Sequence, residues 1–432
     1  MMSFDGTGDR AGWKDTLAFA DQTGVKFTFF VSGVVQLRRD KRWLYRPPGR
    51  ARGATIVAYS ETADEVLERI GYINRALKSG HEIGSHANGH FNGKKWTYRH
   101  WMKELSQFTK LMFNQYKNNR LRPRGDQPKK LDLKPTDIAG FRAPYLKRGK
   151  GLWKALARHG YTYDSSGSDE DMTYWPVKKR GVWFFPLARV PFAPDGSKIH
   201  SMDFNIMVRQ FEPKSKRPHK RQLVYRLYEE QVYQTFLEYF RTSYNGNRSP
   251  VHIGHHYKLN GRILYWNALK RFARTVCKLP EVKCVNYKQL VAFMNRQSPS
   301  AVAAYRRGAF AKAKPLTFDL KLGTYAGFRG NPVGRSHGRS RYQFCSGQYL
   351  GYRGGRGVYT CYRRKSMRAI KRGIRHRGWR VRSWDVHAGG KRATGVASRK
   401  GRRIRIEFNR CYLSPCYSGF EVFRLGHARA SR

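Results

Sequence analysis

The sequence predicts an α/β fold followed by a small basic module that is rich in β-strands. Apolar residues at helical spacing over 63–77 end at Ser79-Gly80, and a short strand, expected to be buried, follows at 82–84. An earlier helical pattern over 13–22 ends at Gly24 before the apolar strand 25–31. Beyond residue 300 the chain changes to short alternating runs such as Arg-Ile-Arg-Ile-Glu-Phe at 403–408, a pattern typical of half-buried strands.

Two histidines follow the short strand predicted at 82–84. Residues 81–91 read His-Glu-Ile-Gly-Ser-His-Ala-Asn-Gly-His-Phe, and the Ala-Asn-Gly between His86 and His90 favours a turn over a helix. In a fold of βα repeats, chemistry is found where strands end in loops. Imidazole is a common ligand of zinc and its first-row neighbours, so the pair is suited to supply half of a metal site. Two hydrogen-bonded surface histidines are the structural alternative.

This stretch closely resembles the second motif of the polysaccharide deacetylases, the NodB-homology family or carbohydrate esterase family 4, in which two histidines bind the metal. Further segments resemble the other motifs of this family, in the same order, over residues 1–297. The resemblance implies a distorted (β/α) barrel of the NodB-homology type with the metal site at the carboxyl ends of its strands.

The start of the chain resembles the first family motif, Phe-Asp-Asp-Gly, whose first aspartate is the catalytic base and whose second is a metal ligand. Here the segment reads Ser-Phe-Asp-Gly at 3–6, with a single aspartate. Without a gap Asp5 takes the position of the base, and with a gap of one residue it takes the position of the ligand. Asp9 is then a candidate for the missing carboxylate. The first strand is unusually short, so we expect that the natural start lies upstream or that a leader has been removed.

Two further strands resemble the third and fifth motifs. Residues 138–145 read Ile-Ala-Gly-Phe-Arg-Ala-Pro-Tyr and match Arg-x-Pro-Tyr, which implies that Arg142 pairs with the catalytic aspartate and that the backbone N–H of Tyr145 stabilises the oxyanion. Residues 251–256 read Val-His-Ile-Gly-His-His and match Leu-x-x-His, which implies that His256 is the catalytic acid. His255 or His252 takes this role on a shifted register.

Candidate substrate-binding residues lie between these motifs. The stretch Tyr-Thr-Tyr-Asp-Ser-Ser at 161–166 is similar to a family segment near the fourth motif, which implies that Asp164 lies beside the pocket. Trp175 and Trp183 are suited to stack on sugar rings, and burial in the core is an equal alternative for both. Residues 201–205 (Ser-Met-Asp-Phe-Asn) offer another polar pair at a strand end.

The charge of the chain is extreme. Its 432 residues contain 86 Lys and Arg against 29 Asp and Glu, a net charge of +57, and residues 301–432 contain 32 against 4. Such a chain is expected to bind polyanions. We expect an anionic polymer of the wall or envelope first and nucleic acid second, and no run is apolar enough to span a membrane. The predicted domains are a catalytic domain at 1–297, a linker at 298–314 and a basic domain at 315–432.

The six cysteines bear on the compartment. Cys277 and Cys284 flank a short loop, which predicts a disulfide and an oxidising environment, although two free thiols are the alternative. Two further disulfides are expected among Cys345, Cys361, Cys411 and Cys416. We therefore expect export to the periplasm, the cell envelope or the medium, even though no signal peptide is visible.

The resemblance implies a metal-dependent hydrolase with one divalent ion, zinc by preference. It would remove N-acetyl or, less often, O-acetyl groups from a polysaccharide such as peptidoglycan, a chitin-like polymer or an exopolysaccharide. Two other hypotheses fit the sequence. The single aspartate of the first motif suits a catalytically weakened sugar-binding protein, and the basic tail suits a polyanion-binding protein in which the barrel is a scaffold.

Overall fold

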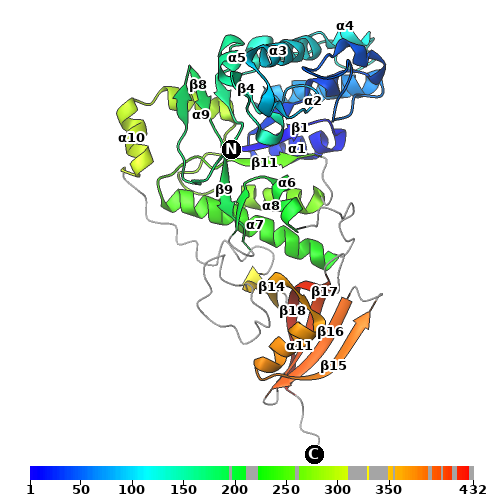
Figure 1. The fold of residues 1–432 in the computed structure, drawn as a ribbon, viewed down its shortest axis with the longest axis vertical. Coiled ribbons are helices and arrows are strands. Elements are labelled where there is room, and N and C mark those ends of the chain that lie inside the picture. The colour runs from blue at the N-terminus through cyan, green and yellow to red at the C-terminus, as the bar shows by residue number, and fades with distance from the viewer. Residues whose placement is uncertain are drawn as a thin grey trace, which may run out of the picture.

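The computed structural model describes residues 1–193, 197–210, 222–257, 262–309, 328–329, 349–353, 356–387, 392–399, 402–410 and 416–427. These residues form an eight-stranded sheet, a three-stranded sheet and, near the C-terminus, a seven-stranded sheet (Figure 1). The first sheet is almost entirely parallel and carries the candidate site, so it is described first.

The eight-stranded sheet has the order β11-β1-β2-β3-β4-β5-β8-β7. Its strands are β1 (Met2–Gly6), β2 (Phe27–Val31), β3 (Glu82–Ser85), β4 (Gly140–Phe141), β5 (Tyr163–Asp164), β7 (Val177–Lys179), β8 (Val182–Phe184) and β11 (Ile253–His256). All neighbours are parallel except β7 and β8. The sheet curls into a half-barrel, which confirms the predicted distorted (β/α) barrel.

Helices alternate with these strands along the chain (Figure 1). They are α1 (Arg10–Thr23), α2 (Ala63–Lys78), α3 (Tyr98–Phe113), α4 (Gln115–Asn119), α5 (Leu152–Arg158), α6 (Asp203–Gln210), α7 (Gln222–Asn245), α8 (Arg262–Val276), α9 (Tyr287–Asn295) and α10 (Pro299–Arg307). Local capping sets their ends. The Thr62 side chain accepts a hydrogen bond from the Glu65 backbone at the start of α2, and Gly24 ends α1 with φ 70°, a conformation that glycine adopts without a steric cost.

The two faces of β1 have different neighbours. Met2 and Phe4 belong to the main apolar core, which also contains the buried Trp13 of α1. Ser3 and Asp5 point to the opposite side, because side chains alternate along a strand, and both contact Arg142. Apolar packing on the helical side therefore fixes which side chains enter the barrel.

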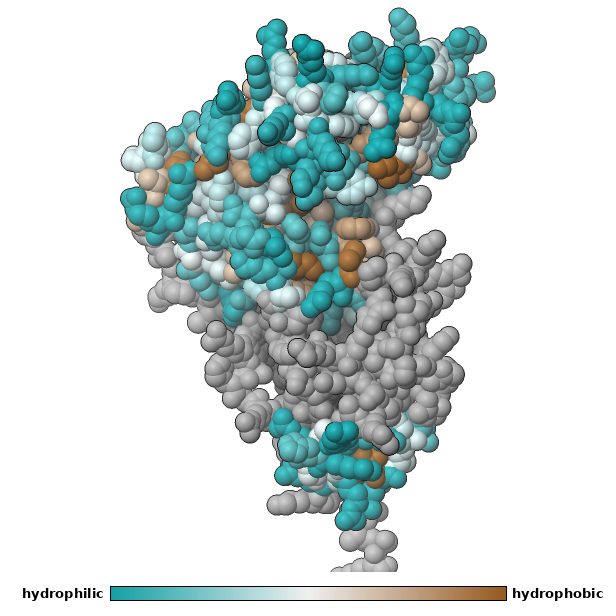
Figure 2. Space-filling model, viewed as in Figure 1, coloured by the Kyte–Doolittle hydropathy of each residue, from teal (hydrophilic) through white to brown (hydrophobic). Residues whose placement is uncertain are grey.

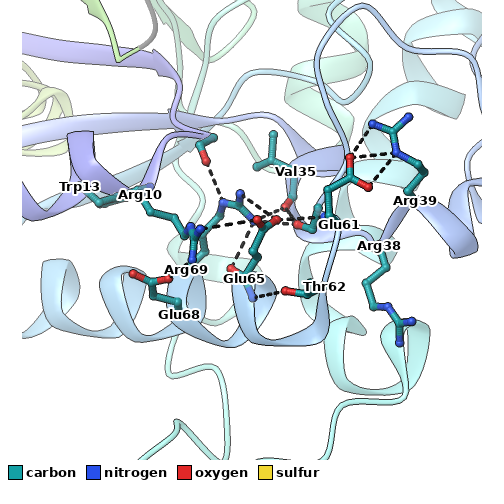
Figure 3. A network of polar contacts seen from close by, with 12 residues as sticks. Arg10, Trp13, Val35, Arg38, Arg39, Glu61, Thr62, Glu65, Glu68 and Arg69 are labelled. Carbon is teal, nitrogen blue, oxygen red and sulfur yellow. Dashed lines mark hydrogen bonds and ion pairs between the residues drawn. The ribbon is translucent and has the colours of Figure 1, made fainter.

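A polar network anchors the loop that follows β1 (Figure 3). The buried guanidinium of Arg69, on α2, donates to the backbone oxygen of Gly8 at 2.9 Å, to that of Val35 at 3.1 Å and to the Ser60 hydroxyl at 2.6 Å. Arg10, at the start of α1, forms an exposed ion pair with Glu68. Arg69 thus donates hydrogen bonds to backbone carbonyl groups of two loops that border the barrel mouth. The exposed ion pair of Arg10 and Glu68 involves side chains only and does not hold either loop.

A second sheet lies in the chain between β5 and α6. It consists of β6 (Ser168–Asp169), β9 (Leu187–Pro191) and β10 (Lys198–His200), in the order β10-β9-β6. The segment after β10 then joins β11, since the backbone N–H of Gly254 donates to the Ser201 oxygen at 3.0 Å. This connection brings the start of α6 to the carboxyl end of β11.

Two segments contain structure that their composition does not indicate. Residues 299–307, which we expected within a linker, form α10, with Ser298 as its N-cap, and Tyr305 stacks on Trp175 at 5.0 Å between ring centroids. The stretch 38–52 is basic and contains Pro and Gly, which predicts an exposed loop, but it contains the 3-10 helix η2 (Arg39–Leu44) and the fully buried Tyr45. In both cases an aromatic side chain finds a partner far away in the sequence, which local composition does not reveal.

The C-terminal sheet is antiparallel, with the order β12-β13-β14-β18-β17-β16-β15. Its strands are β12 (Phe328–Arg329), β13 (Tyr349–Arg353), β14 (Arg356–Ser366), β15 (Arg380–His387), β16 (Arg392–Arg399), β17 (Arg402–Arg410) and β18 (Cys416–His427), and α11 (Met367–His376) connects β14 to β15. Ile374 and Trp379 are buried together with Ile404 and Ile406 of β17. The prediction of a basic module rich in β-structure is confirmed.

Cys277 and Cys284 form a disulfide, as predicted, with their Cα atoms 5.5 Å apart. It ties the end of α8 to the segment that leads into α9. Cys345 and Cys411 lie outside the described residues, as do the side chains of Cys361 and Cys416. On the face seen in Figure 2 most coloured residues are hydrophilic, and no helix in the described part of the chain is long and apolar enough to cross a membrane.

Candidate active site

The candidate site lies at the carboxyl ends of four parallel strands. Asp5 is paired with His256 in the register of β1 and β11. His86 follows β3 directly, and Arg142 follows β4. Parallel strands end at the same edge of a sheet, so the structure gathers residues from four distant parts of the sequence at this edge.

Arg142 holds Asp5 in place. Its side chain is fully buried, and one guanidinium nitrogen, Nη1, donates to Oδ1 of Asp5 at 2.7 Å and to the Ser3 hydroxyl at 2.8 Å. The other, Nη2, donates to the hydroxyls of Ser165 at 2.8 Å and Tyr287 at 2.9 Å. Burial by itself raises the pKa of Asp5, but the charge and hydrogen bond of Arg142, together with the charges of His86 and His256, outweigh burial and leave that pKa below its ordinary value. Asp5 is therefore an ionised carboxylate at neutral pH.

His86 and His90 are arranged as a ligand pair requires. Nδ1 of His86 lies 2.8 Å from the backbone oxygen of Arg142, which makes Nδ1 the donor and leaves the lone pair on Nε2. Metal-binding histidines are oriented in this way by a backbone carbonyl. Burial lowers the pKa of His86 to about 3, so the ring is neutral. The ring of His90 lies 5.1 Å from that of His86, and its buried Nδ1 has no hydrogen-bond partner among the described residues.

A third protein ligand is not in place beside these two. Among the described residues no group of three or more His, Cys, Asp and Glu side chains is arranged to hold a metal ion. Asp9 is the N-cap of α1, and its carboxylate accepts a hydrogen bond from the Gly12 backbone at 2.9 Å. This position gives the predicted role of Asp9 as a ligand no support. The two histidines are suited to hold a divalent ion, whose remaining positions would have to be filled by water or by Asp5.

His256 is paired with a buried aspartate. Oδ1 of Asp203 lies 2.8 Å from Nδ1 of His256, and Oδ2 accepts the backbone N–H of the same residue at 2.8 Å. Burial by itself lowers the pKa of His256, but the charge and hydrogen bond of Asp203, together with the charge of Asp5, outweigh it and raise that pKa above its ordinary value. The protonated form of His256, which a general acid requires, is thus stabilised.

The two other histidines of this strand are less suited to that role. His255 packs against Phe4 and Phe236, and its pKa is lowered, mainly by burial, although Asp203 lies 3.3 Å away. His252 is buried deeper in the barrel, and burial lowers its pKa well below the ordinary value. Of the three registers left open by the sequence, the geometry favours the one with His256 at the site.

Sequence analysis assigned no role to two residues that support this site. Asp203 was noted only as a polar residue near a strand end, and its proximity to His256 depends on the connection from β10 to β11. Tyr287, the first residue of α9, carried no signal at all. Its hydroxyl reaches Arg142 across 145 residues of sequence, and in the sequence alone it resembles any core tyrosine.

The predicted substrate-binding residues are largely enclosed. Asp164 is fully buried, where its carboxylate accepts hydrogen bonds from Nε1 of Trp153 at 2.7 Å and from the Ser166 backbone at 2.8 Å. Trp175 and Trp183 are buried in a core cluster, and the indole N–H of each donates to a protein oxygen. For both tryptophans the structure favours the core alternative, and the position of Asp164 gives direct substrate contact no support.

Two exposed aromatic side chains flank the site instead. Tyr145 is 50% exposed with its ring 5.0 Å from that of His90, and Phe204 is 45% exposed with its ring 6.0 Å from that of His256. Tyr145 lies in the 3-10 helix η5 (Pro144–Leu146) with φ 57°. The first N–H groups of a helix have no partner within it, so the backbone of Tyr145 is suited to donate to a ligand.

Comparison with solved structures finds a similar fold in polysaccharide deacetylases of carbohydrate esterase family 4, at low sequence identity. A structure from Mycobacterium smegmatis that is named as a polysaccharide deacetylase is 16% identical, with a TM-score of 0.43 over 69% of this chain and 91% of its own. A family 4 acetyl xylan esterase from Clostridium thermocellum, solved with a cobalt ion, is 13% identical, with a TM-score of 0.37 over 70% and 94% of the two chains.

A family 4 pseudoenzyme from Bacillus anthracis is also similar. It is 10% identical, with a TM-score of 0.34 over 67% of this chain and 64% of its own. No family model and no curated protein matches the sequence. The chemistry proposed below therefore rests on the residues of this chain.

Proposed function

We propose that the protein is a metal-dependent hydrolase that removes acetyl groups, N-linked by preference, from a polysaccharide. The proposal rests on two titratable groups on adjacent strands whose pKa values are shifted in opposite directions. Arg142 favours the ionised form of Asp5, and Asp203 favours the protonated form of His256. A base and an acid whose pKa values are displaced in opposite directions are what hydrolysis of an amide by general acid–base catalysis needs.

His86 and His90 are the proposed ligands of one divalent ion, with zinc preferred because neutral imidazole suits it. When bound, the ion would polarise the acetyl carbonyl and lower the pKa of a water molecule. Asp5 lies close enough to both histidines to affect their pKa values, so its carboxylate is available either to the ion or to that water.

The protein residues then divide the proton transfers. Asp5 accepts a proton from the attacking water as the new C–O bond forms. The backbone N–H of Tyr145 donates to the oxyanion that develops on the acetyl carbonyl. His256 gives its proton to the sugar nitrogen as the C–N bond breaks, and acetate and a free amino sugar leave. Arg142 and Asp203 keep the two groups in the required protonation states.

An N-acetylated polysaccharide is the proposed substrate, in peptidoglycan, a chitin-like polymer or an exopolysaccharide. The exposed rings of Tyr145 and Phe204, on either side of the histidines, support it, because sugar rings stack on aromatic faces. The disulfide between Cys277 and Cys284 supports the proposal that the protein acts outside the reducing cytosol.

Metal content and turnover test the proposal together. Purified protein offered zinc should retain about one ion by elemental analysis, in keeping with catalytic zinc sites, and should release acetate from N-acetylated oligosaccharides. His90→Ala should lose both properties, whereas the control His100→Ala, at the start of α3, should keep both. Wild-type protein that retains no zinc would exclude the proposed enzyme.

A catalytically weakened sugar-binding protein is the second candidate. The absence of a third protein ligand among the described residues favours it, because fewer ligands weaken metal binding. Binding of N-acetylated oligosaccharides without acetate release, at saturating zinc, would identify this function.

We also propose that the C-terminal sheet binds an anionic polymer of the wall or envelope, with nucleic acid as the lesser candidate. Among residues 371–385, 394–399 and 402–406, ten are Lys or Arg and one is acidic. The exposed Arg380 and Arg403 both lie opposite Ser398 in the register of β15, β16 and β17, and the exposed Arg382 donates to the Ser398 hydroxyl at 2.7 Å. Three arginines therefore lie around one position of β16, which supports recognition of an extended polyanion.

A further inference from the structure

The loop that carries both histidines has an unfavourable backbone conformation. Ala87 has φ 56° and His90 has φ 58°. Residues that carry a side chain are disfavoured in this left-handed region, and they persist there only where their surroundings hold them. The contacts of the loop with the rest of the protein therefore decide whether the two imidazoles keep their relative positions.

A buried carboxylate from another element holds the centre of this loop. Glu104 of α3 is fully buried, and its Oε1 accepts the backbone N–H of Asn88 at 3.0 Å. The backbone oxygen of Glu104 accepts Nδ2 of the same asparagine at 2.8 Å. Glu104 thus bonds both the main chain and the side chain of the residue midway between the histidines.

Tyr45 completes this support. Its fully buried hydroxyl donates to Oε1 of Glu104 at 2.9 Å and accepts the backbone N–H of Gly89 at 3.2 Å. The two consecutive N–H groups of Asn88 and Gly89 are therefore both held by one pair of side chains. We call Glu104 and Tyr45 the loop clamp.

Other contacts hold the carbonyl groups of the loop and the N–H of Ala87. Gly33 donates to the Ala87 oxygen at 2.9 Å, and Ile56 donates to the Gly89 oxygen at 2.9 Å. The Ser85 hydroxyl accepts the Ala87 N–H at the longer distance of 3.3 Å. The clamp is the side-chain support of the two central N–H groups of the loop.

We propose that Glu104 and Tyr45 are positioning residues that set the separation and orientation of His86 and His90 as metal ligands, acting through Asn88 and Gly89. The inference rests on the proposed metal site. It goes beyond that site in assigning a role to two residues that touch neither the ligands nor the substrate. Outer-shell residues of other metal centres orient the ligands in a comparable way, and their loss typically weakens metal affinity by about 10- to 100-fold.

The probe is zinc alone, titrated into the full-length apo-protein in competition with a chromophoric chelator. Tyr45→Phe removes one hydroxyl, and Glu104→Gln removes the negative charge while it keeps the shape. Burial raises the pKa of Glu104 to about 7, so measurements at pH 8.5 compare an ionised carboxylate with a neutral amide. Tyr59→Phe is the matched control, since Tyr59 belongs to the same apolar cluster as Tyr45 but donates to the Gly53 oxygen.

We expect zinc affinity to fall by about 10- to 100-fold in both clamp variants and by less than twofold in Tyr59→Phe. At saturating zinc the clamp variants should regain most of their turnover, which a loss of folded protein would not allow. Unchanged zinc affinity in a folded Tyr45→Phe protein would overturn the inference, even if Glu104→Gln fails to fold. Wild-type protein that binds zinc but releases no acetate would overturn the proposed function and leave the clamp assignment intact, whereas wild-type protein that binds no zinc overturns both.

Discussion

Nη1 of Arg142 lies 2.7 Å from Oδ1 of Asp5, and both side chains are buried, although 137 residues separate them in the sequence. A buried ion pair of this kind is stabilising only when its remaining donors are satisfied. Ser3, Ser165 and Tyr287 satisfy those of Arg142. The pair therefore explains how a carboxylate remains ionised at the mouth of an apolar barrel.

Substitution of Asp5 tests its role as the base. Asp5→Asn keeps the shape and removes the proton acceptor, so turnover should fall by about 10²–10⁴-fold while zinc stays bound. Acetate release and elemental analysis measure the two effects separately. Loss of zinc would make Asp5 a ligand, as the shifted register of the first motif requires, and full activity would exclude both roles.

Substitution of Asp9 separates a helix cap from a metal ligand. Asp9→Ala removes the acceptor for the Gly12 N–H, so it should lower the free energy of unfolding by about 0.5–2 kcal/mol and leave zinc content unchanged. Denaturant unfolding of the apo-protein and elemental analysis measure these quantities. If zinc is lost while stability is unchanged, Asp9 is the ligand that replaces the missing aspartate of the first motif.

The pair of His256 and Asp203 predicts a shift in the pH dependence of turnover. Asp203 raises the pKa of His256 above its ordinary 6.5, so Asp203→Asn should lower that pKa and move the alkaline limb of kcat/KM to lower pH. Asp21→Asn, which removes a surface partner of Arg75, is the control and should leave the profile unchanged.

The same pair also contributes to the free energy of unfolding. Its contribution is lost as the pH rises, whereas that of a buried carboxylate with a lowered pKa is lost as the pH falls. Because the folded-state pKa of His256 is raised, its contribution is complete below about pH 6.5 and is lost as the pH rises through the folded value. The stability difference between wild type and Asp203→Asn should therefore shrink above that pH. A constant difference would contradict the assignment of the raised pKa to Asp203.

The position of α10 decides where the C-terminal domain can be removed. Truncation after Ala309 keeps the contact of Tyr305 with Trp175 and should leave turnover of small acetylated substrates nearly unchanged. It should lower binding to anionic polymers, with a difference that shrinks as salt rises. Loss of small-substrate turnover would mean that the C-terminal domain contributes to the active site.

The disulfide tests the proposed compartment. Mass spectrometry of non-reduced digests should find Cys277 linked to Cys284 in protein recovered from its native host. Alkylatable thiols at both positions would contradict export. The control is the same digest after reduction, in which both cysteines should be alkylated.

Sequence analysis identified the strand ends of the site because each is defined locally. β1, β3 and β11 each belong to a short sequence motif with a polar residue at or near the end of the strand, and Pro144 forces the chain away from β4 soon after Arg142. The partners of these residues could not be predicted in the same way. Asp203 reaches His256 only through the connection from β10, and Tyr287 reaches Arg142 from a helix that starts beyond the last strand of the barrel.

The predicted linker at 298–314 contains a helix, α10, that we did not predict. Ser298, Pro299 and Gly308 are the N-cap, first residue and C-terminal glycine of α10, so the helix signals were present in the sequence. The linker was predicted from the change in charge composition beyond residue 296, which carries no information on helix formation. What holds α10 is the stacking of Tyr305 on Trp175, a long-range contact without a local signal.

The pairing of β1 with β11 also governs when the site can exist during synthesis. Ser3 and Ile253 are 250 residues apart. During synthesis β1 can therefore pair with β2 early, but it can pair with β11 only after most of the barrel has left the ribosome. Until then β1 presents an open edge to other chains. Asp5, the proposed base, is therefore synthesised long before His256, the proposed acid. Premature termination between β5 and β11 should yield an aggregation-prone fragment rather than a partly active enzyme.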